Sequence, residues 1–502
     1  MELNREPQPP GLRRTALTSL SSYAVPVLIS LVAMPVVFRL LGASHFGILS
    51  IALLSPALAA SLDLGVTSAA VRRLALELEE RGATLGAALG TYALALILVG
   101  AALGLVIAGV APWLVAWLGF APVMGVEAGI ELVHLCALWM ALSLALSLPG
   151  IVMRARLRFG ELTIVQSACT LALWVAAITL SANGSGLWPI VASALLMTVL
   201  SSIACLVLAR RDLSSIAKAR VDIGMLRSDA RFSSGLFLVQ LSNVIAFQLD
   251  RVIVSALASP AAAGVYALCV GVANKTLFAV AALTSFAYPR VAAMQGSDKE
   301  AEVGMFLQAL SRVAIVVVAP VILPAVLLSG PFLKLWVGGP PSQSVQLMQL
   351  LWVGYALAAV CAPATHVITG TGTSRLAATF AWVTAILLLS GMYLLVPPFG
   401  LVGAGIANVI AMSSALLFLL LVRRQLDVPR DPGRRRLFVG IAAGCLAQLT
   451  FLVLLLPLVD SWLLFVLAGM GSLAVYQLVR WSLGSLAAEE VRLIQSLSIR
   501  LR

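Results

Sequence analysis

Charged residues are scarce in this chain of 502 residues: Lys, Arg, Asp and Glu make up only 11% of it, against 61% hydrophobic residues. The mean hydropathy is +1.04. A soluble protein of this length needs far more charge on its surface, so the composition excludes a soluble globular protein and predicts a polytopic membrane protein. The net charge of +12 then reflects membrane topology rather than binding to nucleic acid, and we expect no nucleic-acid partner.

Residues that usually carry chemistry are also few. The chain has three isolated histidines, no HExxH or GxSxG motif and no Walker motif, and its six cysteines lie apart in apolar runs without a CxxC pair. The loops predicted outside the cytoplasm, such as SANGSGLWP and PPFG, are too short for a catalytic domain. The sequence therefore predicts no enzyme activity and no metal or organic cofactor.

Long apolar runs dominate what is present. Runs of about 20 apolar residues, the length that crosses a bilayer as a helix, can be placed fourteen times. The predicted spans are 18–41, 47–71, 85–107, 131–152, 162–181, 187–209, 232–257, 264–289, 306–333, 345–369, 376–395, 402–421, 437–458 and 462–483. The predicted fold class is an all-α polytopic membrane protein. Trp113 and Trp117, between the third and fourth spans, suit the membrane interface.

The positions of the basic residues predict the topology. On the fourteen-span drawing, 29 of the 33 Lys and Arg residues fall on one side, which the positive-inside rule makes cytoplasmic, together with both termini. The predicted segments are a cytoplasmic N-terminus (1–17), a first lobe (18–209), a basic linker (210–231), a second lobe (232–421), a basic loop (422–436), two further helices (437–483) and a cytoplasmic tail (484–502).

One stretch of the chain occurs twice. Residues 47–75 align without a gap to residues 264–292 at a shift of 217 positions, and each copy begins with a glycine, Gly47 or Gly264, and ends beyond an arginine, Arg73 or Arg290. Self-similarity at this distance indicates two copies of a half-protein. Because each half has six spans, the halves enter the membrane in the same direction, which predicts two parallel six-helix lobes around a central cavity.

Five ionisable residues lie within predicted spans, where a charge is costly unless it faces a cavity or a partner. They belong to the first two helices of each lobe: Arg39, Asp63, Asp250, Arg251 and Lys275. Three cations and two acids favour a site for an anionic ligand. Structural roles remain open for several of them: Asp63 or Asp250 could neutralise a neighbouring cation, and Arg39 could reach the membrane interface. Lys275 is too deep in its span for that.

Polar residues extend this candidate site along span 7. Gln240, Asn243 and Asp250 share one side of a helix, and Asn274 in the next span could meet it. Arg73 and Arg290 close their spans at the cytoplasmic side. We interpret them as anchors or, alternatively, as a cytoplasmic gate that contacts a lipid phosphate.

These residues also carry a resemblance. Arg39-Leu-Leu-Gly42 with Phe46-Gly47, and Asp63-Leu-Gly65, resemble the opening of polysaccharide (O-antigen, Wzx-type) flippases, and Asp250-Arg251 with Gly264-Val-Tyr266 resembles the start of their second lobe. These flippases belong to the multidrug/oligosaccharidyl-lipid/polysaccharide exporter superfamily. The resemblance implies two six-helix lobes around a cationic cavity, and carriage of an undecaprenyl-diphosphate-linked oligosaccharide across the bacterial cytoplasmic membrane by alternating access.

The resemblance also implies partners. The cations Arg39, Arg251 and Lys275 would hold the diphosphate head group, while Asp63 or Asp250 would bind a coupling H⁺ or Na⁺. Membrane lipids, and polysaccharide polymerases or glycosyltransferases, are the expected partners. The two C-terminal spans resemble the extra pair of the lipid II flippases, which form a groove for the lipid tail.

Three alternatives stay open from the sequence. A multidrug exporter of the same superfamily normally has twelve spans and an acidic cavity, which the three buried cations disfavour. A lipid II flippase fits the two additional spans but fits the first-span arginine pattern less well. A scaffold that recruits envelope enzymes would need a partner-binding linker, whereas the two linkers are short and basic.

Overall fold

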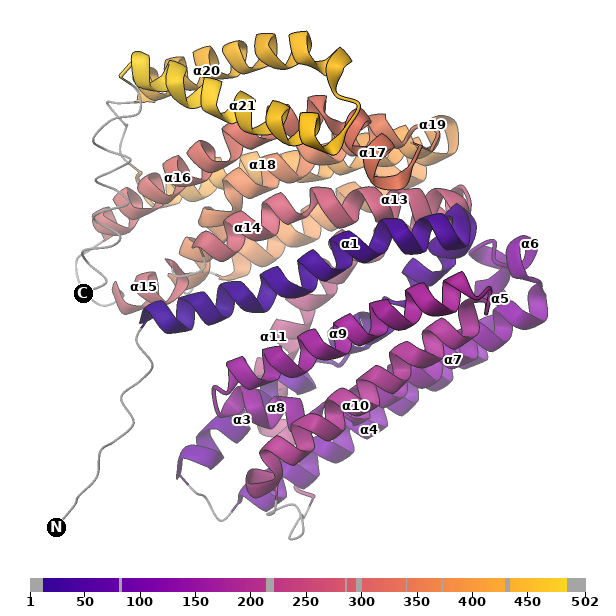
Figure 1. The fold of residues 1–502 in the computed structure, drawn as a ribbon. Coiled ribbons are helices and arrows are strands. Elements are labelled where there is room, and N and C mark those ends of the chain that lie inside the picture. Colours follow the sequence, from indigo (N-terminus) through magenta and orange to yellow (C-terminus); the bar gives the residue numbers. More distant parts are fainter. Residues whose placement is uncertain are drawn as a thin grey trace, which may run out of the picture. The chain divides into compact units, whose positions relative to one another are not determined.

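A computed structural model describes residues 12–80, 84–213, 221–284, 287–294, 300–339, 341–371, 374–428 and 434–484. Every regular element in these ranges is a helix (Figure 1). The chain divides into two compact units, residues 1–264 and 265–502. The predicted N-terminal segment, the two basic connections and the C-terminal tail lie wholly or partly outside the described residues.

The first unit contains the helices from α1 to α12 and the start of α13. Their bounds are α1 Leu12–Ala52, α2 Ser55–Ser61, α3 Val66–Glu80, α4 Leu85–Gly109, α5 Ala111–Trp117, α6 Ala121–Met124, α7 Val126–Ala145, α8 Leu148–Ala155, α9 Phe159–Ala182, α10 Leu187–Leu213, α11 Ile223–Phe247, α12 Asp250–Leu257 and α13 Pro260–Ala273. An apolar cluster joins α3, α4, α7, α8 and α10, around buried residues such as Leu74, Leu89 and Val152.

The second unit contains the remaining helices. Their bounds are α14 Lys275–Thr284, α15 Ala287–Met294, α16 Glu300–Leu327, α17 Ser329–Val337, α18 Ser344–Gly370, α19 Ser374–Gln425, α20 Arg434–Leu455, the 3₁₀ turn Leu456–Leu458 and α21 Trp462–Ser482. Its apolar core is formed by α15, α16, α18 and α19, around Val291, Leu307 and Ile368.

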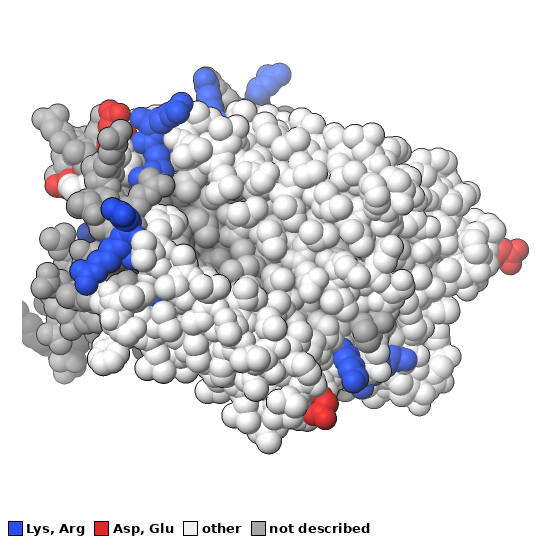
Figure 2. Space-filling model, turned by 90° about the horizontal axis from the view of Figure 1, so that it is seen from above, with Lys and Arg blue, Asp and Glu red and all other residues white. Residues whose placement is uncertain are grey.

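Eleven helical segments among the described residues are long and apolar enough to cross a membrane. Large side chains such as Leu105 and Leu394, both 74% exposed, remain outside the packed interior, as expected for a surface that meets lipid rather than water. In Figure 2 the face in view is almost free of charged residues, which lie at its edges. The protein is therefore a multi-pass membrane protein, while the count of fourteen spans stays a prediction.

Helix α19 accounts for part of the difference in count. At about 1.5 Å per residue, 30 residues of straight helix would separate Thr384 from Ser414 by roughly 45 Å. Their hydroxyl groups are instead hydrogen-bonded at 2.8 Å. The chain folds back at Gly400, whose φ of 60° and ψ of −133° are not helical. The two halves of α19 thus coincide with the predicted spans 376–395 and 402–421.

Helix α1 bends in the same manner, at Gly42, which has φ 75° and ψ 167°. The rings of Phe38 and Phe46 lie 5.3 Å apart on either side of this bend, whereas eight residues of straight helix would span about 12 Å. The break falls next to residue 41, where the sequence predicts the end of the first span.

The first copy of the repeated stretch is broken into three helical pieces, and the second copy is broken at Asn274, although the sequence predicts one span for each. In the first copy the pieces are the end of α1, α2 and α3, and in the second copy the break separates α13 from α14. The breaks lie at polar residues or at residues with strained backbone angles, which a hydropathy average over a whole span does not detect. Leu64 and Gly65, for example, both have positive φ.

The two glycines that begin the copies contact each other. A Cβ on Gly47 would lie 1.8 Å from the carbonyl oxygen of Pro260, and a Cβ on Gly264 would lie 2.2 Å from that of Ala43. The 217-residue shift converts each of these contacts into the other, so the contact has a local two-fold symmetry. Only glycine allows such close backbone approach, as at small-xxx-small helix crossings in membranes.

A buried hydrogen bond joins α20 to α16 within the second unit. Pro324 has no N–H, so the carbonyl of Pro320 loses its partner within α16. The side chain of Gln448, which is fully buried in α20, donates a hydrogen bond of 2.9 Å from Nε2 to this carbonyl. An unpaired carbonyl in hydrocarbon costs several kcal/mol, so this bond fixes where α20 packs.

Candidate functional site

Asp63 lies at the break between α2 and α3. Its side chain is 3% exposed. Oδ1 accepts a hydrogen bond of 2.8 Å from the Gly65 N–H, and Oδ2 accepts one of 2.7 Å from the Thr67 N–H. Asp63 therefore satisfies the first amides of α3 in the manner of an N-cap. Both carboxylate oxygens are engaged, which favours the structural interpretation of this acid.

Asp250 lies at a second break, between α11 and α12, and is 1% exposed. Its Oδ1 accepts from the Arg251 backbone N–H at 2.8 Å and lies 3.8 Å from Arg251 Nε. The other oxygen, Oδ2, is buried without a hydrogen-bond partner, as are Arg251 Nε and the side-chain oxygen of Gln248. This loose ion pair leaves hydrogen-bonding capacity unused, in contrast to Asp63, and sequence reasoning did not single out Gln248.

The other predicted residues of the first unit differ in exposure. Arg39 in α1 and Gln240 in α11 are exposed, and Asn243 is partly buried, one helical turn before Phe247. In the second unit, Asn274 and Lys275 lie where α13 ends and α14 begins, and both are partly buried. The side-chain oxygen of Asn274 is buried without a hydrogen-bond partner. Asp63, Asp250 and Lys275 therefore all lie at breaks between helices.

Arg73 is part of a hydrogen-bonded network. Its Nε and Nη2 donate to the two carboxylate oxygens of Asp229 in α11 at 3.1 and 3.0 Å, and the hydroxyl of Tyr92 in α4 donates to Asp229 Oδ2 at 2.5 Å. Nη2 also donates to Ser228 at 3.2 Å. Arg290, the repeat equivalent of Arg73, lies over the ring of Phe306 at 5.2 Å.

The electrostatics of this network favour the charged carboxylate. Burial raises the pKa of the Asp229 carboxyl, but hydrogen bonds from Tyr92 and Arg73 lower it by more, so the pKa lies below its usual range. The pKa of the Arg73 guanidinium is raised, chiefly by its hydrogen bond to Asp229. Neither Tyr92 nor Asp229 was identified from the sequence as a site residue. Tyr92 is one of many residues in an apolar span, and Asp229 is one of the acids in the basic linker, so neither has a local signal.

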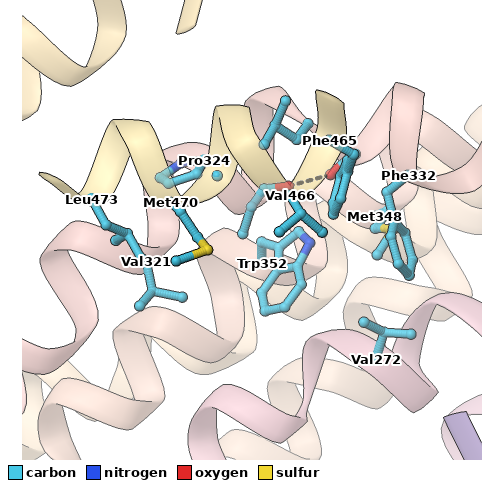
Figure 3. A pocket seen from close by; sticks show the side chains of 14 residues that line it. Val272, Val321, Pro324, Phe332, Met348, Trp352, Phe465, Val466, Met470 and Leu473 are labelled. Atoms are coloured by element: carbon cyan, nitrogen blue, oxygen red, sulfur yellow. Dashed lines mark hydrogen bonds between the residues drawn. The ribbon is translucent and has the colours of Figure 1, made fainter. Parts of the chain in front are cut away.

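An apolar pocket lies between α21 and the helices α13, α16, α17 and α18 of the second unit, with a volume of about 370 Å³. Figure 3 shows Met470 and Trp352 coming together in it, with Phe332 and Phe465 beside them. The hydroxyl of Ser329 on its wall bonds the Ala325 carbonyl at 2.6 Å, so the wall offers little polarity. Such a pocket suits a hydrocarbon chain.

Metal ligands do not gather in the described ranges: no group of three or more His, Cys, Asp or Glu residues could hold an ion. The six cysteines are free thiols. What the site residues offer is charge and hydrogen bonding at helix breaks, together with an apolar pocket.

The fold is that of the transporters of the MOP superfamily. The structure is similar to the lipid II flippase MurJ in an inward closed conformation, with a TM-score of 0.69 and 14% identity over 93% of this chain and 98% of that one. It is also similar to a multidrug resistance MATE family transporter in an inward-facing conformation, with a TM-score of 0.65 and 14% identity over 82% and 98% of the two chains.

A third similar structure is a MOP superfamily transporter from Pyrococcus furiosus, with a TM-score of 0.52 and 15% identity over 83% and 95% of the chains. A search of curated protein sequences gave no match. The family model described as polysaccharide biosynthesis protein matches residues 36–345, more than half of the chain. The chain belongs to this family of polysaccharide biosynthesis proteins.

Proposed function

We propose that this protein is a secondary transporter that flips an undecaprenyl-diphosphate-linked oligosaccharide from the inner to the outer leaflet of the bacterial cytoplasmic membrane. Membership of a polysaccharide biosynthesis family, in a chain with a transporter fold, is the observation that carries the proposal. A charged sugar diphosphate cannot cross hydrocarbon unaided, and alternating access provides a path for it. No step of this process breaks or forms a covalent bond.

The head group of this substrate would bind to cations at helix breaks. Arg251 is the best supported of them, since its ion pair with Asp250 is long and its Nε has no hydrogen-bond partner. Lys275 in the second unit and Arg39 in α1 would add positive charge, and the amides of Gln240, Asn243 and Asn274 would contact sugar hydroxyls. A guanidinium suits this role because it binds phosphate oxygens with two parallel hydrogen bonds.

The polyprenyl tail would occupy the apolar pocket beside α21. Its aromatic and aliphatic walls, among them Trp352 and Phe465, match the chemistry of isoprene units. The role follows the resemblance of the C-terminal helix pair to that of the lipid II flippases.

A coupling cation, H⁺ or Na⁺, would bind at Asp250 rather than at Asp63. Asp250 Oδ2 and the Gln248 side-chain oxygen are buried acceptors without partners, whereas both oxygens of Asp63 are hydrogen-bonded. A proton or a sodium ion would satisfy acceptors of this kind. In this proposal both termini are cytoplasmic, and glycosyltransferases supply the substrate while a polymerase receives it.

The test uses a strain that lacks the protein and is complemented with wild type, Arg251→Ala or Lys275→Ala. We expect lipid-linked glycan to accumulate on the cytoplasmic leaflet and surface polysaccharide to fall in both variants, at normal protein levels. Arg158→Ala is the control, because this arginine pairs on the surface with Glu161 three residues away. Unchanged lipid-linked glycan with altered tolerance to cationic drugs would refute the proposal and favour a multidrug exporter.

A further inference from the structure

The side chains of Arg73 and Tyr92 surround the carboxylate of Asp229 as they would surround a phosphate. Two guanidinium N–H groups and one phenol O–H donate to its two oxygens, at distances from 2.5 to 3.1 Å. Carboxylate and phosphate oxygens match the guanidinium fork equally well, because both present two acceptors in one plane. We propose that Arg73 and Tyr92 form a binding site for the diphosphate of the lipid-linked substrate, and that Asp229 occupies this site when no substrate is bound.

The two donors come from helices other than the one that carries Asp229. Arg73 comes from α3, and the hydroxyl of Ser228, bonded to the Met225 carbonyl at 2.8 Å, accepts from Arg73 and fixes its direction. Tyr92 comes from α4 and is fully buried, so its hydroxyl has little freedom. Arg73 and Tyr92 belong to α3 and α4, so both can keep their places when Asp229 moves away together with Ser228, which shares α11 with it.

The blocking residue is anchored on the helix that carries Tyr92. The backbone N–H of Asp222, just before α11, donates to the buried Thr91 hydroxyl at 2.9 Å, and Asp222 caps α11 through the Gly224 N–H at 2.8 Å. Asp229 follows seven residues later, on the same side of α11. A small rotation of α11 about this anchor moves Asp229 out of the site without unfolding the helix.

Access and charge suit a lipid phosphate. The side chain of Arg73 is 27% exposed and that of Asp229 10%, so water and solutes reach the edge of the site. Arg72, which is exposed, adds positive charge close to Asp229. The network follows the second predicted span on the side that the basic residues predict to be cytoplasmic, where the substrate is made. The site would therefore load the head group before it crosses.

The repeat supplies an internal comparison. At the equivalent position of the second copy, the Arg290 guanidinium lies 5.2 Å from the centre of the Phe306 ring. Among the described residues, Arg73 contacts a carboxylate and Arg290 contacts an aromatic ring, so the two copies give this arginine different surroundings.

This inference rests on the proposed function for its substrate, but its test is a binding measurement. The full-length protein, in nanodiscs of phosphatidylcholine, is titrated with farnesyl diphosphate. We expect Asp229→Asn to bind about ten-fold more tightly than wild type, because the competing charge is removed. Adding Tyr92→Phe to Asp229→Asn should remove much of this gain. Asp212→Asn is the matched control, since Asp212 pairs with Arg156 at 2.7 Å without a tyrosine, and should leave the affinity unchanged.

An exchange of charges separates a binding role from an architectural one. The double variant Arg73→Asp with Asp229→Arg can restore the ion pair, so we expect thermal stability close to wild type, but it should bind farnesyl diphosphate at least ten-fold more weakly. Wild-type affinity in this variant, or no gain for Asp229→Asn, would overturn the proposal.

Two further binding measurements identify which kind of phosphate the site binds. Inorganic pyrophosphate should bind more weakly than farnesyl diphosphate, and equal affinities would refute a lipid ligand. Phosphatidylglycerol added to the nanodiscs should not abolish the gain of Asp229→Asn; if it does, the site binds bulk anionic lipid and the proposal fails. Tight binding by a wild-type protein that exports no glycan would refute the proposed function while leaving the anion site intact.

Discussion

The contact between Gly47 and Gly264 predicts a definite cost for adding one methyl group. In Gly47→Ala the new Cβ would lie 1.8 Å from the Pro260 carbonyl oxygen, and in Gly264→Ala it would lie 2.2 Å from that of Ala43. A carbon–oxygen contact needs about 3.3 Å, so the crossing must widen by roughly 1.5 and 1.1 Å respectively. Backbone atoms cannot rotate away, so we expect a loss of about 3 kcal/mol, at the upper end of overpacking costs.

The double variant tests the symmetry of the crossing. Both methyl groups push the same two backbone segments apart, so a widening that relieves the larger clash also relieves the smaller one. We therefore expect Gly47→Ala with Gly264→Ala to cost about as much as Gly47→Ala alone, not the sum of the two. Independent contacts would give additive losses.

Thermal unfolding of the detergent-purified protein, followed by size-exclusion chromatography after heating, measures these effects. Gly109→Ala is the control, because no atom lies within 4 Å of the position that its Cβ would take. It should be neutral or slightly stabilising, as alanine usually is in a helix. Equal melting temperatures for Gly47→Ala and Gly109→Ala would refute the close crossing.

Other predictions concern the buried polar contacts. Gln448→Leu should destabilise the protein by about 1–2 kcal/mol, and by less in a Pro324→Ala background that restores the missing N–H, as a thermal double-mutant cycle would measure. Asp63→Ala should cost about 1 kcal/mol as a lost helix cap, while Asp63→Asn should retain glycan export and Asp250→Asn should lose it, measured as surface polysaccharide. The pKa of the Asp229 carboxyl is lowered in the folded protein, so this group stabilises the fold at every pH above the ordinary carboxyl pKa. The stabilisation is lost only when the pH falls through the pKa of the folded state. The loss of thermal stability in Asp229→Asn, measured by thermal unfolding, should therefore be the same at every pH between about 5 and 8.

Hydropathy predicted the all-helical membrane class and the boundaries of several long helices. Spans such as 85–107 and 345–369 agree with α4 and α18 to within a few residues, because a bilayer-length apolar run has few other stable structures. The alignment paired Gly47 with Gly264 as repeat equivalents but did not predict that the two residues contact each other.

The breaks within spans were not predicted. An averaged apolar run does not reveal that Asp63 caps a new helix or that Gln248 and Asp250 interrupt span 7, since these depend on single hydrogen bonds and backbone angles. The pocket beside α21 was not predicted either, because the residues that line it are as distant in sequence as Val272 and Leu473. Pairing of Arg73 with Asp229 spans 156 residues and has no local signal.

The bond between Gln448 and the Pro320 carbonyl sets an order of events during synthesis. Helix α16 enters the membrane more than a hundred residues before α20 leaves the ribosome, and until then the Pro320 carbonyl has no partner within its helix. Until Gln448 has been synthesised, the Pro320 carbonyl of the nascent chain is therefore either unpaired in hydrocarbon or satisfied by some other group. Arrival of α20 supplies the hydrogen-bond donor for this carbonyl, so packing at Pro320 is completed only when nearly the whole chain has been made.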